Sequence, residues 1–170
     1  MNDNPSLDAL LAEEQELQFP SFNADVAWVL GNHIRERARI ASSPIAIEIS
    51  RSGQQLFFAA LLGATPDNAE WIRRKRALVQ RFHHSSLYMS VEAEQKGRPF
   101  LQRYGLSEQD YAAAGGGFPI FVKDTGCVGA VVVSGLPQLE DHRLVTEAVR
   151  ATITGLTMSQ IGETVEQEGI

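Results

Sequence analysis

Apolar and polar positions follow the same order twice along this chain, alternating first as in strands and then recurring as in a helix. Each time, two stretches rich in β-branched and aromatic residues flank a three-residue turn that ends in glycine, which is typical of a β-hairpin. The four predicted strands are 45–50, 54–62, 118–123 and 127–134. A proline and then a helical period follow each pair. The pattern therefore predicts two hairpin–helix units.

Helical periods also occur before the first hairpin. Residues 5–17 place leucines on one side and glutamates on the other, which predicts a helix that docks on the domain. Residues 23–41 form a second predicted helix, which Asn23 or Asp25 can cap. Between these helices, Phe19 lies in an apolar stretch that a proline interrupts, so any strand there is short or at a sheet edge.

The helices that follow the two hairpins are predicted over 67–84 and 141–156. In the first of them, Asp67 and Glu70 have the spacing of a capping box. In the second, Gly155 weakens the helix without forbidding its continuation, so the sequence leaves its end open.

The long connection between the helix at 67–84 and the second hairpin has weaker signals of secondary structure. Residues 90–96 have a helical pattern that ends before a glycine. Ser107 and Asp110 have capping-box spacing, which predicts a short helix over 107–113. A connection this long usually carries structure or function of its own.

These elements together predict an α+β domain. The two hairpins and the short strand near Phe19 give five strands, and hairpin connections make the sheet mainly antiparallel. Helices 23–41, 67–84 and 141–156 can then cover the sheet. The chain has no low-complexity segment or linker, so residues 1–170 are expected to form one domain.

Composition narrows the function classes. The formal net charge is −6 and the isoelectric point is about 5.2, which argues against a general nucleic-acid or anionic-membrane binder. No apolar run is long enough to span a bilayer, and the acidic N-terminus does not resemble a secretory signal. Cys127 is the single cysteine. We therefore expect a soluble cytoplasmic protein with no nucleic-acid or membrane partner.

Lys75 is the least ordinary residue of the first hairpin's helix, because it lies within the apolar stripe, four residues after Trp71. One explanation is that its stem covers the core while the ammonium group reaches water. The other is that the charge is withdrawn from water and compensated by a carboxylate or an anionic ligand. In that case, a ligand carboxylate beside Trp71 would meet the requirement.

The second hairpin has glycines before it and polar residues after it. Gly115, Gly116 and Gly117 precede a strand rather than a helix, so they do not form a phosphate loop; they serve as a flexible joint or let a ligand approach the backbone closely. Asp141 can cap the last helix. Alternatively, Asp141 and His142 form the polar rim of a pocket, with His142 donating a hydrogen bond, exchanging a proton or ligating a metal.

The other histidines give no metal or catalytic pattern. His83 and His84 are adjacent and cannot both face one metal from a regular helix, so they and the two serines after them are predicted to be exposed or capping. His33 lies near the apolar face of its helix, where a hydrogen-bonded core histidine is expected. The sequence therefore predicts no metal site.

A combination of motifs resembles the GlcG/HbpS-like superfamily, also called the haem-degrading domain. The residues that carry the resemblance are Phe57-Phe58, Asp67-Asn68, Trp71, Lys75, Phe82, Ser85-Ser86, Gly115 to Pro119, Gly129-Ala130, Val133 to Gly135 and Asp141. They are most similar to the uncharacterised branch that includes a yeast member. The resemblance covers about residues 15–157. Together with the leucine pattern before it, this divides the domain into a docking helix at 1–16, a core at 17–157 and an extension at 158–170.

This resemblance implies a profilin-like or PAS-like fold and homo-oligomeric assembly. Members of the superfamily have been linked to haem binding, haem breakdown or small-metabolite pathways. No haem-ligating residue of the superfamily can be matched to a position in this chain.

Three functions follow as hypotheses. The first is an oligomeric protein that binds a small anionic molecule, with haem as one candidate, through Trp71, Lys75, the three glycines and Asp141. The second is an enzyme acting on haem or a small metabolite, with Asp141 or His142 in proton transfer. The third is a protein-interaction module.

Overall fold

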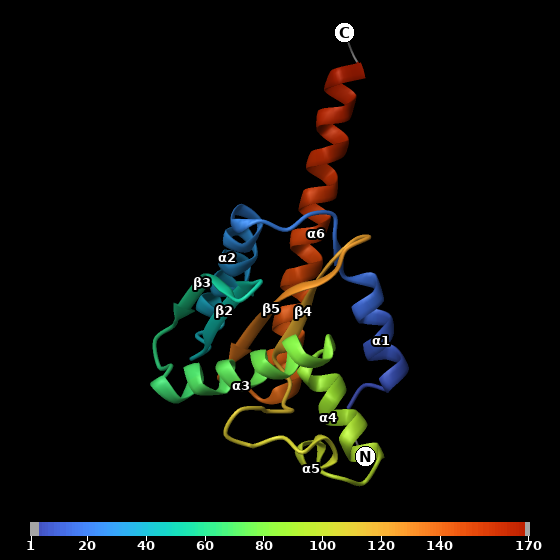
Figure 1. The fold of residues 1–170 in the computed structure, drawn as a ribbon. Coiled ribbons are helices and arrows are strands. Elements are labelled where there is room, and N and C mark those ends of the chain that lie inside the picture. The colour runs from blue at the N-terminus through green and yellow to red at the C-terminus, as the bar shows by residue number, and fades with distance from the viewer. Residues whose placement is uncertain (1–3, 169–170) are drawn as a thin grey trace.

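The computed structural model describes residues 4–168, with side chains through Gln160, and these residues form six helices and five strands (Figure 1). In chain order they are α1 Leu7–Glu16, β1 Gln18–Phe19, α2 Ala24–Ile40, β2 Ala46–Arg51, β3 Gln54–Ala60, α3 Pro66–Phe82, α4 Ser86–Gln95, α5 Phe100–Tyr104, β4 Gly117–Val122, β5 Gly126–Ser134 and α6 Gln138–Glu168. No helix within this part of the chain is long and apolar enough to cross a membrane.

The five strands form one sheet in the order β1-β4-β5-β2-β3. The hairpins β2–β3 and β4–β5 are both antiparallel, and β2 and β5 pair antiparallel to join them. Only β1 is parallel to its neighbour, β4. The mainly antiparallel, five-stranded sheet of an α+β domain is therefore confirmed.

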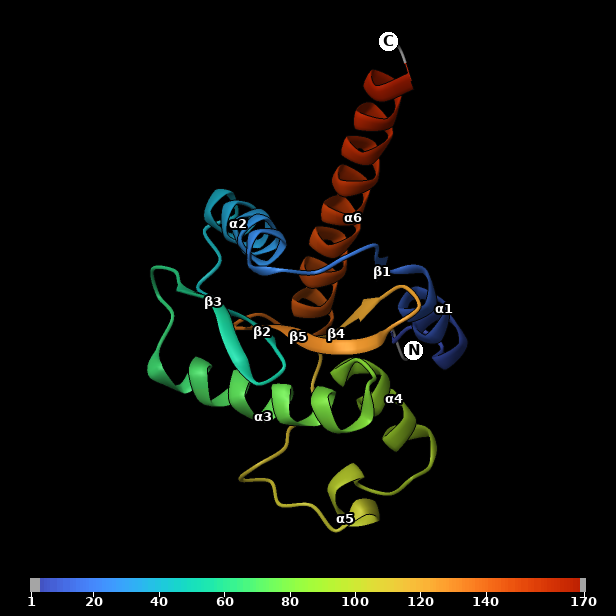
Figure 2. The same ribbon diagram turned by 45° about the horizontal axis from the view of Figure 1, so that its top comes forward.

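Helices cover both faces of this sheet (Figure 2). Ile47 and Val133 point to the face that α2 and α6 cover, whereas Ala46 and Val132, one residue away, point to the face that α3 and α4 cover. This alternation is the two-residue period of a strand, and it explains why β2 and β5 read as nearly continuous apolar runs. The sheet is thus the middle of three layers.

Helix α1 lies beside these layers, against α4 and close to the start of α6 (Figure 1). Ser6 caps it by accepting a hydrogen bond from the amide of Ala9 at 3.2 Å. Its apolar contact is small, with Leu10 packing on Leu87 and Val91. The remaining attachments are polar and belong to the site described below.

The start of α3 differs from the prediction. The cap is Thr65, whose amide donates to the side chain of Asn68 at 2.8 Å, and not Asp67. Asp67 instead accepts from the indole of Trp71, and Glu70 pairs with Arg73. The cap falls two residues earlier because Pro66 takes the first helical position, where its missing amide hydrogen costs nothing.

The connection after α3 was also predicted incorrectly in part. Helix α4 begins at Ser86, before the expected start at residue 90, because the Ser85 hydroxyl accepts from the amide of Tyr88. Residues 107–113 do not form a helix. The Ser107 hydroxyl accepts from the amide of Gln109, which closes a turn, and a short helix forms earlier as α5.

Helix α6 begins at Gln138, earlier than the predicted start at residue 141, and it continues to Glu168, an end that the sequence left open. Its first turns cross the sheet, and its last turns project away from the other elements (Figure 1). Among the side chains described in α6, Leu156 is the last that packs on the core, and Met158 is 68% exposed. Gly155 does not end the helix.

Gly31 and Gly155 provide a matched pair of substitutions for testing this packing. A Cβ atom on Gly31 would lie 2.5 Å from Cγ of Phe57, so we expect Gly31→Ala to lower the free energy of unfolding by about 1–3 kcal/mol. A Cβ atom on Gly155 would meet nothing, so Gly155→Ala should raise it by up to about 1 kcal/mol. Urea denaturation measures both, and equal effects would contradict the close packing of α2 on β3.

Candidate functional site

Lys75 is buried at the centre of the site. Its Nζ atom donates to the carbonyl oxygens of Gly115 at 2.7 Å and Val133 at 3.1 Å, and to Oδ2 of Asp141 at 3.2 Å. Its side chain is only 4% exposed, so the explanation in which the ammonium group reaches water is wrong. The three hydrogens of an ammonium group match these three acceptors.

Asp141 is the carboxylate that compensates this charge. It lies in the first turn of α6, where a negative charge interacts favourably with the helix dipole. Its Oδ1 atom accepts from the amide of Leu136 at 3.1 Å, while Oδ2 faces Lys75. The prediction that Asp141 caps α6 is therefore wrong, because the helix begins at Gln138 and the bonded amide belongs to the segment before it. Asp141 instead supplies the carboxylate that compensates Lys75.

Burial acts on both charges of the pair. It lowers the pKa of Lys75 and raises the pKa of Asp141, because each group has lost its water, and the attraction between them opposes both shifts. The hydrogen-bond partners favour the ionised pair, since Lys75 faces only acceptors and Asp141 only donors. The pair is thus a desolvated ionic contact inside the domain.

The glycine segment fits around this pair. Gly116 has a φ angle of +123°, and a Cβ atom there would lie 2.6 Å from the oxygen of Val133 and 2.8 Å from Nζ of Lys75. The next amide, of Gly117, donates to the hydroxyl of Ser86 at 2.8 Å. These glycines therefore allow close approach of the backbone and are held by specific contacts.

A cavity of about 290 Å³ opens beside the pair. It is lined by Asp67, Asn68, Trp71, Lys75, Ala114, Gly115, Ser134, Gly135, Leu136, Gln138 and Asp141. Four of the predicted ligand-binding residues thus line one cavity, while Gly116 and Gly117 lie behind them. Helices α3 and α6 both begin at this cavity, so the positive ends of two helix dipoles are directed toward it.

Trp71 stands at the rim of the cavity. Its indole nitrogen donates to Asp67 at 3.2 Å, and the guanidinium group of Arg74 lies 4.2 Å from its ring centroid. The indole is partly exposed and held on two sides. It can therefore offer a fixed aromatic surface to a small molecule.

His142 faces another part of the molecule. Its Nε2 atom lies 2.8 Å from Oε2 of Glu13 in α1, and its Nδ1 atom is buried with no hydrogen-bond partner within the described residues. It lines a second cavity, of about 470 Å³, between α1 and α6. Successive residues of a helix point about 100° apart, so the structure does not bring His142 and Asp141 together.

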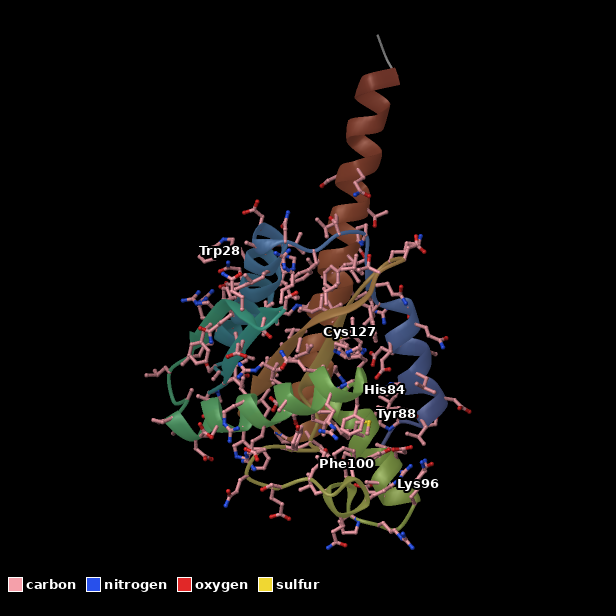
Figure 3. The ribbon with its side chains drawn as sticks, in the orientation of Figure 1. Trp28, His84, Tyr88, Lys96, Phe100 and Cys127 are labelled. Carbon is pink, nitrogen blue, oxygen red and sulfur yellow. The ribbon has the colours of Figure 1, made fainter. Side chains whose placement is uncertain are left out.

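A second polar anchor of α1 was not predicted from the sequence. Glu14, expected on the wet side, is buried, and it accepts from the amide of Ser85 and contacts Nδ1 of His84, each at 2.7 Å. His84 also stacks on Tyr88 (Figure 3). The spacing could have predicted that Glu14 faces the domain, because it lies four residues after Leu10 on the apolar stripe of the helix.

The remaining histidines lie outside both cavities. His33 is half-buried and its Nδ1 atom is 3.0 Å from the hydroxyl of Thr152, as expected for a hydrogen-bonded histidine near the core. His83 is exposed and takes a left-handed conformation that ends α3. Ser85 and Ser86 are buried, so the prediction that they are capping is right for Ser85 and the prediction that they are exposed is wrong.

The fold and site together define a class of α+β domain, in which a buried lysine–aspartate pair joins a glycine segment to two helices around one sheet. Residues 22–150 match the family described as haem degrading protein HbpS-like, and the chain belongs to this family. This confirms the family that the sequence motifs indicated.

Several known proteins are similar over most of the chain. A UPF0303 protein of Streptomyces avermitilis is 49% identical over 150 residues, covering 88% of this chain and 92% of its own. A UPF0303 protein of Serratia proteamaculans is 44% identical, covering 95% and 99%. Among solved structures, that of the Ybr137w protein is 28% identical with a TM-score of 0.83, covering 89% and 90%.

A more distant structure has the same fold. The crystal structure of a PduOC:heme complex superposes with a TM-score of 0.66 at 18% identity, covering 77% of this chain and 94% of that chain. At this identity the likeness concerns the fold alone.

Removing one member of the ion pair should cost more than removing both. Asp141→Asn leaves the buried ammonium group unpaired, so we expect a loss of about 3–5 kcal/mol in the free energy of unfolding by urea. Lys75→Met combined with Asp141→Asn should recover part of this loss. Glu147→Gln, which breaks the exposed pair with Arg37, is the control and should have a small effect. A loss for Asp141→Asn no greater than the control's would contradict the buried pair.

The attachment of α1 should depend on pH. The hydrogen bond to Glu14 raises the pKa of His84 above its ordinary value of 6.5, and this outweighs the lowering by burial. The contribution of the His84–Glu14 pair to folding stability is therefore complete below about pH 6.5, and it is lost as pH rises through the raised pKa of His84. We expect the difference in unfolding free energy between wild type and His84→Gln, measured in urea, to shrink as pH rises from about 6 to 9. A constant difference would contradict this.

Proposed function

We propose that this protein is a cytoplasmic, homo-oligomeric binding protein for a small polar molecule, and that the ligand occupies the cavity beside Lys75 and Asp141. One observation carries the proposal. Trp71 and Lys75 of α3, Gly115 of the glycine segment and Asp141 of α6 are far apart in sequence, yet all line this single cavity. A concave site with an aromatic wall and convergent polar groups is the usual form of a small-molecule site.

The charges around the cavity narrow the kind of ligand. Asp141 already neutralises Lys75, and Asp67 adds a carboxylate that bonds to Trp71. An anionic ligand would therefore be received by the positive ends of α3 and α6 rather than by a free ammonium group. The volume of about 290 Å³ lies at the lower end of ligand pockets and suits a small metabolite with hydrogen-bonding groups.

Haem is the first ligand to consider, because the family is described as haem degrading and the PduOC structure is a complex with heme. Among the described residues, no histidine lines the Lys75–Asp141 cavity, and a tetrapyrrole is larger than this space. His142 lines the larger cavity beside α1, but Glu13 holds its Nε2 atom and its Nδ1 atom is enclosed. Neither of these two cavities, as described, therefore fits haem ligation.

The enzyme hypothesis receives less support from the geometry. Asp141 and His142, the candidates for proton transfer, have different partners and line different cavities. Either residue acting alone would need a free atom that faces the substrate. Both oxygens of Asp141 already accept hydrogen bonds, and Glu13 holds Nε2 of His142. The binding function is the better match to the site.

The first experiment is native mass spectrometry of the purified protein, to detect any small molecule it retains. Thermal-shift titrations with succinate and with succinamide then compare an anion with an uncharged analogue of similar shape. We expect Trp71→Ala to weaken binding of the retained molecule, or of the better probe, at least about tenfold by removing the aromatic wall. Trp28→Ala removes the same residue type from an exposed position outside the cavity and should leave affinity unchanged.

Two results would overturn this assignment. One is an affinity that Trp71→Ala and Trp28→Ala change equally. The other is stoichiometric haem binding that is seen as a shifted Soret band and is lost in His142→Ala, which would move the site to the cavity beside α1.

A further inference from the structure

Strand β3 is the last strand on one side of the sheet, and no strand within the described residues pairs with its outer edge. The amide of Leu61 donates to the carbonyl of Ile45 at 2.9 Å. Backbone groups alternate sides along a strand, so every second residue before Leu61, namely Ala59 and Phe57, also directs its amide and carbonyl toward β2. Phe58 and Ala60, which alternate with them, turn their amides and carbonyls outward. Of the two sheet edges, this is the long one, because β1 has only two residues.

Two of the usual protections of a sheet edge, charge and proline, are absent from β3, and its β-bulge lies near its start, between Gln55 and Phe57. Residues 54–62 contain no charged residue and no proline. Phe58 is 45% exposed and Leu62, just after the strand, is 99% exposed. Soluble proteins normally protect a strand edge with lysine, proline or a covering element, because an open edge pairs with another strand.

Helix α2 adds a second exposed apolar surface beside this edge. Trp28 is 64% exposed and lies on the outer side of α2, with its ring 5.9 Å from that of Phe57 (Figure 3). The helix follows the strand, since Gly31 packs on Phe57 and Arg39 lines the same hollow as Leu62. Helix α2 and strand β3 therefore run in the same direction along this side of the molecule.

The charges of α2 are polarised along this direction. Asp25 lies in its first turn, and Arg35, Arg37 and Arg39 lie toward its end. Glu36 pairs with Arg39 and Glu147 of α6 pairs with Arg37, so the excess positive charge at this end is small and comes from Arg35. A surface of this kind is complementary to itself when two copies meet head to tail. The acidic, dipole-positive beginning of one helix then lies near the basic, dipole-negative end of the other.

We infer that β3 is a self-association surface, on which β3 of a second copy pairs antiparallel about a two-fold axis. This arrangement satisfies the outward peptide groups, covers Phe58 and Trp28, and places the two α2 helices antiparallel with opposite charges adjacent. A two-fold contact requires one patch to match itself, and an uncharged strand beside a polarised helix meets that requirement. The two sheets then continue as one.

The inference rests on the homo-oligomeric part of the proposed function and does not depend on its ligand. No residue of α2 or β3 lines the cavity at Lys75, so assembly and ligand binding can fail separately. Two other occupants of the edge are an extended segment of a different protein and the projecting end of α6 from another copy. The experiment distinguishes them.

Light scattering coupled to size exclusion tests the surface through its mass. Ala60→Pro removes an outward amide hydrogen without removing a bond to β2, and Phe58→Lys places a charge on the edge. We expect each variant to lower the mass of the wild-type assembly about twofold at the same concentration. Met158→Lys, on the exposed part of α6, is the matched control and should keep the wild-type mass.

Each other outcome overturns the inference. A monomeric wild type at high concentration would exclude self-association through β3. Unchanged mass in both edge variants, or dissociation by Met158→Lys alone, would assign assembly to another surface, including the end of α6. An edge variant that fails to unfold cooperatively in urea is set aside, and the mass of the other variant then tests the inference. The unfolding midpoint of that variant is compared with wild type at a protein concentration at which wild type is dissociated, so that it reports folding alone.

Discussion

The buried ion pair between Lys75 and Asp141 is the constraint on which this site depends. It joins α3 to the first turn of α6, and through the same ammonium group it holds carbonyls of Gly115 and β5. Four segments, namely α3, the glycine segment, β5 and the start of α6, therefore have fixed positions relative to one another. Because a desolvated charge without its partner is costly, the arrangement has little freedom to relax while the domain stays folded.

The first turn of α6 has contacts in two directions. Asp141 fixes it to α3, and the adjacent His142 contacts Glu13 of α1. Since α1 has only a small apolar contact of its own, polar pairs hold it to the domain, including the pair of Glu14 with His84. Asp141 and His142, which are adjacent in sequence, thus line the cavity beside Lys75 on one side and attach α1 on the other.

Membership of the HbpS-like family establishes the fold and leaves the ligand to be argued from this chain's own residues. The cavity beside the ion pair is small, and its described lining has several polar side chains and no histidine. The exposed edge at β3 lies away from that cavity. The proposed ligand site and the proposed self-association surface therefore do not overlap.

The sequence by itself determined the hairpins, the main helices and the residue types of the site. These follow from local regularities, namely the two-residue period of strands, the helical period and glycine at the turns. It also identified Lys75 as unusual, because a charge on an apolar stripe needs an explanation wherever the helix packs. Local competition between caps produced the errors, since Thr65 with Pro66 outcompeted Asp67, and Ser107 closed a turn rather than a helix.

Only the tertiary structure decided which groups meet. The partner of Lys75 lies 66 residues away, and no local pattern distinguishes a protein carboxylate from a ligand carboxylate as the compensating charge. In the same way, a one-residue step along α6 separates Asp141 from His142 because side chains follow the helical turn. Hydrogen-bond partners across the fold depend on how the layers pack, and that packing is a property of the whole chain.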